Sequence, residues 1–154
     1  MKDRWLPVGL VAGVLFVVNA IARLVVRLAA PKSDSKQITI GLVLFGVVGL
    51  VMVAAAFRWG RRYPMPRVFA DLGVVIVVSC LLSVLLGPFA GGSLPFKEGV
   101  GLFFGEIWRY LGYTAAGVVL GLLILMALGL DYRSQALKRY TEVRQARPRR
   151  VVRR

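Results

Sequence analysis

The sequence predicts an all-α membrane protein: a four-span transmembrane helical bundle with an outer amphipathic interfacial helix and a basic cytoplasmic tail. The first observation is that 58% of the 154 residues are hydrophobic and that these residues are gathered into long blocks. A helix needs about 20 apolar residues to cross the roughly 30 Å hydrocarbon core of a bilayer, so such blocks are typical of membrane spans. The second observation is a formal net charge of +14, carried mainly between and after the blocks, where the flanks of membrane helices are often basic.

The first span is predicted at residues 5–29. Its apolar run is longer than that of an ordinary signal peptide, and Arg23 and Arg27 stand where a neutral cleavage region would lie. An uncleaved signal-anchor helix is therefore favoured over a cleaved signal peptide. Asn19, Arg23 and Arg27 are spaced by four residues, which predicts that they share one helix face.

The second span is predicted at 38–57, which contains no ionisable group. The following segment, 58–67 (RWGRRYPMPR), holds four arginines and two prolines. Because a proline disfavours helix in the residue before it, we expect a turn here. The third span is predicted at 68–86, where it meets Gly87-Pro88.

The stretch 87–112 interrupts the apolar blocks without being dominated by basic residues, and it holds Glu98 and Glu106. Apolar residues recur at helical spacing between 96 and 111, which predicts an amphipathic helix in the membrane interface with Trp108 and Tyr110 at headgroup depth. The fourth span is then predicted at 113–130. One long tilted helix over 97–130 is the alternative, and Gly112 does not decide between the two.

The remaining residues, 131–154, form a basic tail after the membrane domain of residues 1–130. Residues 131–146 have a helix-forming composition, and Pro148 should end that helix. The final residues, RPRRVVRR, are expected to be disordered and solvated.

Basic residues near the span ends predict the orientation, because they are enriched on the cytoplasmic side. With four spans, one side receives the short N-terminal segment, the 58–67 turn and the tail, with fifteen basic residues, against six on the other. We therefore expect both termini in the cytoplasm of a cell (inner or plasma) membrane and the 87–112 stretch outside. The excess of arginine over lysine, with abundant Ala, Val and Gly, favours a bacterial source.

The composition also limits the chemistry. The sequence has no histidine, which excludes histidine-ligated haem, histidine-containing zinc sites and histidine general bases. Cys80 is the single cysteine, so no intrachain disulfide or CxxC pair can form. No ionisable residue lies near the middle of a predicted span. We expect no catalytic residue, no cofactor and no metal site, and hence no enzyme.

Two charged clusters are candidate binding sites. The outer cluster could bind an anion or lipid headgroup or pair the helices, and it consists of Asn19, Arg23, Arg27, Glu106 and Arg109. In the more ordinary interpretation, Arg23 and Arg27 reach lipid phosphates while Glu106 pairs with Arg109. At the inner side, anionic lipid of the inner leaflet or a protein partner could contact seven arginines: Arg58, Arg61, Arg62, Arg67, Arg147, Arg149 and Arg150. Nucleic acid is disfavoured because the tail lacks interleaved aromatic residues.

Two small-residue motifs, Gly9-x-x-x-Gly13 and Gly117-x-x-x-Gly121, could let helices approach closely, within the monomer or against another copy or partner. The function that these features favour is an accessory or structural subunit of a larger membrane assembly. The alternatives are a small oligomeric transporter or channel, and a membrane tether whose basic tail recruits a cytoplasmic partner.

Overall fold

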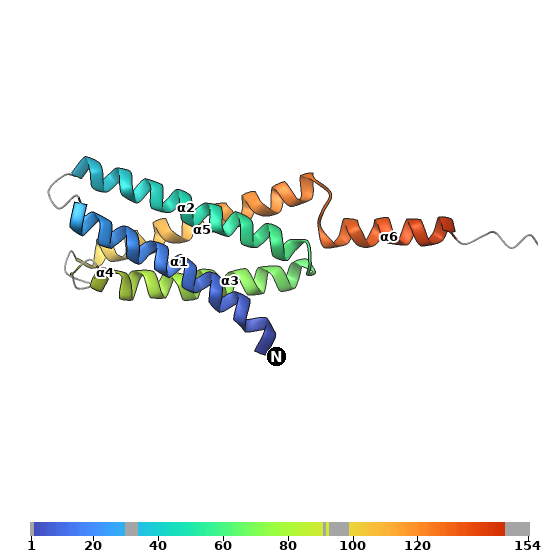
Figure 1. Cartoon of the computed structure of the whole chain (residues 1–154), viewed down its shortest axis with the longest axis horizontal. Coiled ribbons are helices and arrows are strands. Elements are labelled where there is room, and N and C mark those ends of the chain that lie inside the picture. Colours follow the sequence, from blue (N-terminus) through green and yellow to red (C-terminus); the bar gives the residue numbers. More distant parts are fainter. Residues whose placement is uncertain (1, 30–33, 91, 93–98, 147–154) are drawn as a thin grey trace, which may run out of the picture.

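The computed structural model describes residues 2–29, 34–90, 92 and 99–146. Within this part the elements are α1 (Lys2–Ala29), α2 (Asp34–Gly60), α3 (Met65–Leu81), a π-helical turn η1 (Leu82–Leu86), α4 (Gly87–Ala90), α5 (Val100–Ala127) and α6 (Tyr132–Ala146) (Figure 1). No described residue lies in a strand. Four helical stretches are long and apolar enough to cross a membrane, beginning at Trp5, Ser35, Met65 and Val100. The predicted all-α bundle with four spanning helices is confirmed.

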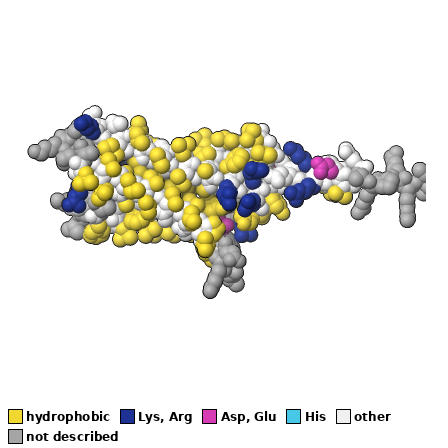
Figure 2. Space-filling view, in the orientation of Figure 1, with side chains coloured by type: hydrophobic (Ala, Val, Ile, Leu, Met, Phe, Trp, Pro, Cys, Tyr) yellow, Lys and Arg dark blue, Asp and Glu magenta, His cyan; other side chains and the backbone are white. Residues whose placement is uncertain are grey.

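The spanning helices run side by side and alternate in direction (Figure 1). The N-terminus, the turn between α2 and α3 and the start of α6 consequently lie toward one end, and α6 continues away from the bundle. Figure 2 shows hydrophobic side chains along the length of the bundle, with lysine and arginine gathered toward its two ends. This distribution suits a bilayer, because charged groups are costly in hydrocarbon and favourable at its borders.

A short proline-containing turn joins α2 to α3. The amides of Arg62 and Tyr63 donate to the Trp59 carbonyl at 3.0 and 2.9 Å, and Pro64 is extended immediately before α3. The fixed φ of proline suits this position at a helix start. The turn expected from the sequence is therefore present, although it is shorter than the 58–67 segment because α2 continues to Gly60 and α3 begins at Met65.

A glycine and an aspartate separate α5 from α6. Gly129 has φ +60°, a left-handed conformation that glycine adopts without a Cβ clash, and the next amide, Leu130, donates to the Leu125 carbonyl at 3.2 Å. Asp131 Oδ2 then accepts from the Ser134 amide at 3.1 Å, which caps the start of α6. These contacts end one helix and begin the next, so α6 is a separate element.

The expected interfacial helix at 96–111 requires a correction. Residues 96–98 lie outside the described part of the chain, and 100–111 form the first turns of α5 without a break before the span. The alternative of one long helix is thus the observed one. The physical reason is that part of the apolar stripe, Phe103, Ile107 and Leu111, packs on the bundle core rather than on a membrane surface. A single helical glycine at 112 costs only about 1 kcal/mol relative to alanine and does not break the helix.

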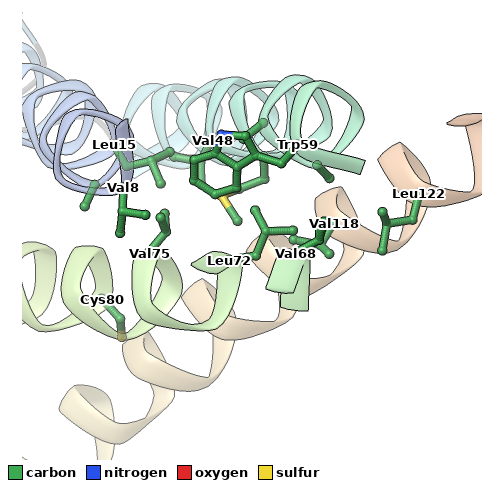
Figure 3. Close-up of a cluster of buried hydrophobic side chains, with 14 of the residues drawn as sticks. Val8, Leu15, Val48, Trp59, Val68, Leu72, Val75, Cys80, Val118 and Leu122 are labelled. Carbon is green, nitrogen blue, oxygen red and sulfur yellow. The ribbon is translucent and has the colours of Figure 1, made fainter. Parts of the chain in front are cut away.

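The core lies where α1, α2, α3 and α5 meet, and buried side chains from all four helices point into it (Figure 3). Contact is closest between α2 and α5. A Cβ built on Gly117 would lie 2.6 Å from the Gly49 carbonyl oxygen, and one on Gly121 would lie 2.6 Å from the Val53 carbonyl oxygen. The second small-residue motif therefore serves packing within the monomer, one of the two roles considered for it.

Candidate functional site

Asn19, Arg23 and Glu106 form a polar cluster between α1 and α5. Arg23 Nε donates to Asn19 Oδ1 at 2.9 Å, and Arg23 Nη2 makes an ion pair with Glu106 Oε1. Asn19 is 4% exposed, whereas the side chains of Arg23 and Glu106 retain 24% and 36% of their accessibility. The spacing of four residues along α1 places the amide where it orients the guanidinium toward α5. The arrangement is an ion pair that joins two helices.

The backbone of Gly87, at the end of the third spanning segment, lies close to this cluster. A Cβ built on Gly87 would lie 2.8 Å from Arg23 Nε and 3.1 Å from Asn19 Oδ1, so a larger residue here would force these side chains to shift. The Gly87 amide donates to the Leu82 carbonyl five residues earlier, in the π-helical turn that precedes Pro88. Such single π turns are frequent at functional sites. Here the turn brings the backbone beneath the ion pair.

The other two members of the predicted outer cluster do not join it. Arg27 lies against the backbone near Gly92, where a Cβ would be 2.9 Å from Arg27 Nη1. Arg109 is exposed, and its Nε donates to the Gly105 carbonyl of its own helix at 3.3 Å. The ordinary interpretation of Glu106 as a partner of Arg109 is thus replaced by its contact with Arg23. Glu98 lies outside the described residues.

A buried group of hydroxyls between α3 and α5 was not expected as a unit. Tyr110 is 2% exposed and its hydroxyl faces Ser79 and Ser83, both fully buried. Thr114 Oγ1 donates to the Tyr110 carbonyl at 2.8 Å. Tyr110 thus faces the bundle interior, whereas Trp108 is 79% exposed, and the headgroup depth expected for both stays a prediction. The sequence does contain a signal for this group. Ser79 and Ser83 are four residues apart, as are Tyr110 and Thr114, and this spacing puts each pair on one helix face.

The predicted inner cluster divides into two environments. Arg67 stacks over the Tyr63 ring, with its Cζ 4.0 Å from the centroid, and its Nε lies 3.6 Å from Asp71 Oδ2. Arg58, Arg61 and Arg62 instead line a cavity of about 830 Å³ between the end of α2 and the start of α6. Arg139 of α6 lines it as well and was missed by sequence reasoning, because the position of the start of α6 beside the end of α2 cannot be derived from residue spacing. Arg147, Arg149 and Arg150 lie outside the described residues.

Comparison with known proteins gives one partial similarity. The chain is 33% identical over 97 residues to the thromboxane A2 receptor of Chlorocebus aethiops. The matched stretch is 58% of this chain but only 28% of the receptor, so the chain spans less than a third of the length of that relative. No family model and no solved structure matches. The similarity agrees with the fold on one point: this chain is a membrane-spanning helical protein.

Proposed function

We propose that the chain is a non-catalytic accessory or structural subunit that docks on a larger membrane assembly through α1. The observation that carries the proposal is the free glycine face of this helix. Cβ atoms built on Gly9 and Gly13 meet no atom within 4 Å, and the neighbouring Leu6 and Leu10 are 69% and 59% exposed. Small residues let membrane helices approach closely, which is how such helices associate without a hydrophobic driving force.

The interior of the bundle supports a docking role over conduction by a single chain. Leu15, Met52, Leu72, Val75 and Leu125, which come from all four spanning helices, are each at most 1% exposed. At the level of these five side chains an ion would lose its hydration among apolar atoms, although Asn19, Asp71 and the hydroxyls between α3 and α5 are buried at other positions along the helices. A transporter or channel would therefore require a pathway between several copies.

The test is purification of the full chain from its native membrane in a mild detergent, with native mass spectrometry of the product. We expect stoichiometric membrane partners that are lost in Gly9→Leu/Gly13→Leu. Gly73→Leu is the matched control, because Gly73 is also exposed on a spanning helix with no atom within 4 Å of a built Cβ. Equal loss in the control, or a monomer without partners, would refute the proposal; a homo-oligomer would favour the channel alternative.

The tether is a second candidate because α6 leaves the bundle with apolar side chains in water. Leu137, Tyr140 and Val143 are 59%, 63% and 57% exposed. A tether should retain a soluble partner in the same purification of Gly9→Leu/Gly13→Leu. It should lose that partner when residues 144–154 are deleted. This pair of results would favour the tether over the docking subunit.

We also propose that both termini face the cytoplasm, in a cell (inner or plasma) membrane. The support is the basic excess at the end that carries the N-terminus, the α2–α3 turn and the tail. In a Cys80→Ala background, Gln145→Cys should react with a membrane-impermeant maleimide only after lysis, and Gly101→Cys in intact cells. Reversed labelling would invert the topology.

A further inference from the structure

The cavity between α2 and α6 is walled by cations. Three of its arginines, Arg58, Arg61 and Arg62, come from the end of α2 and the turn after it, and Arg139 faces them from the second turn of α6. The Gln135 side chain on α6 donates to the Arg61 carbonyl at 3.5 Å, so the two walls are linked directly. With a volume of about 830 Å³, the space between them is larger than a bare ion needs.

The positive charge of these walls is not neutralised by the described part of the protein. The ion pairs found there are Arg23 with Glu106 and Arg67 with Asp71, and neither involves an arginine of the cavity. Glu142, three residues after Arg139 on α6, is exposed and forms none of these ion pairs, and Asp131 accepts the Ser134 amide as the cap of α6. Like charges gathered around one space repel each other, and an anion in that space removes the repulsion. The charge of the cavity walls therefore favours an anionic ligand.

The residue types indicate which anion. A guanidinium offers planar, paired N–H donors that match the oxygens of phosphate, and it remains charged at any physiological pH. Tyr132, which also lines the cavity, adds a neutral hydroxyl donor, whereas the Gln135 amide already donates to the carbonyls of Arg61 and Leu130. A phosphate group with further polar substituents would satisfy this set of donors better than a halide or a single carboxylate.

The position of the cavity indicates the source of that phosphate. Phe57, in the last apolar turn of α2, lies on the cavity wall, and the Arg61 Cζ is 5.8 Å from the centroid of its ring. Figure 2 shows basic groups gathered toward this end of the bundle, beside its last hydrophobic side chains. Arginines at the end of a spanning helix reach the lipid headgroups, while the acyl chains lie along its apolar turns. We propose that the cavity binds the phosphate-bearing headgroup of an anionic membrane lipid, with α2 and α6 as its two walls.

The site does not depend on the docking role proposed for α1, since it uses different helices. The test uses the full chain in detergent, titrated separately with phosphatidylglycerol, phosphatidylcholine and inorganic phosphate, with bound lipid counted by native mass spectrometry. We expect phosphatidylglycerol to be retained preferentially. Arg61→Gln/Arg139→Gln, one change on each wall, should weaken its retention about tenfold, since each substitution removes charge-assisted hydrogen bonds.

The matched control is Arg133→Gln/Arg144→Gln. It removes the same charge from exposed positions of α6 that do not line the cavity, and it should change retention less than about twofold. Ala136→Trp fills the cavity without altering its charge and should also displace the lipid. This variant tests the proposal if the arginine variant fails to fold. Equal weakening in wall and control variants, equal retention of the two lipids, or saturation by inorganic phosphate alone would each overturn the proposal.

Discussion

Alanine at Gly117 or Gly121 should destabilise the bundle by about 3 kcal/mol at each position, near the upper end of the cost of overpacking. The added Cβ would meet the carbonyl oxygen of Gly49 or Val53 at 2.6 Å. Backbone atoms cannot rotate away as a flexible side chain can, so α2 and α5 would have to separate. The stacked rings of Phe45 and Tyr113, whose centroids lie 4.5 Å apart across the same pair of helices, would be disturbed with them.

The measurement is equilibrium unfolding in mixed micelles, followed by helical circular dichroism. Gly112→Ala is the control on the same helix: nothing lies within 4 Å of its built Cβ, and alanine favours helix over glycine by about 1 kcal/mol. We expect that variant to be as stable as the parent or more so. If all three alanine variants unfolded alike, close approach of the two helices would not be what the glycines provide.

Loss of the ion pair between Arg23 and Glu106 is expected to have the next largest effect. Arg23→Gln or Glu106→Gln should each cost about 2 kcal/mol, less than for a fully buried pair because both side chains are partly exposed. The remaining charge would stay beside Asn19 and the Gly87 backbone without its partner. Single reversals, Arg23→Glu or Glu106→Arg, should cost more, because two like charges then meet.

The double reversal decides whether the contact itself matters. Arg23→Glu/Glu106→Arg should recover part of the stability lost in either reversal, as judged by thermal unfolding of the purified protein in detergent. Recovery should be incomplete because the Asn19 amide and Gly87 are arranged for an arginine on α1. Arg109→Gln, at an exposed position on the same helix as Glu106, should be nearly neutral. No rescue by the double reversal would mean that the pair contributes no stability.

The features of this structure that depend on residues close together in the chain can be predicted from the sequence. Apolar block length locates four spans, and Pro64 locates a turn, because membrane thickness and proline geometry act locally. The face shared by Asn19 and Arg23 follows from helical spacing alone. These features could be derived without knowing how any two helices pack.

The sequence alone does not show which of two environments a residue occupies when its side chain suits both. An apolar stripe from 100 to 111 fits a membrane surface or a bundle core equally well, and packing of Phe103 and Ile107 on the core decides it. Tyr110 is amphipathic and could face a headgroup or buried hydroxyls for the same reason. Arg139 lines the same cavity as Arg61 only because of the direction in which α6 leaves the cap at Asp131.

The unbroken α5 has a consequence for the bilayer itself. Its 28 residues extend about 42 Å, as do those of α1, against a hydrocarbon core of about 30 Å. Such hydrophobic mismatch is accommodated by tilt or by overhang into the headgroup layer. Arg23 and Glu106 lie about 9 Å from the adjacent ends of their helices, at the border of the core. A thicker bilayer draws this pair into hydrocarbon and tightens it, whereas a thinner one admits water and weakens the link between α1 and α5.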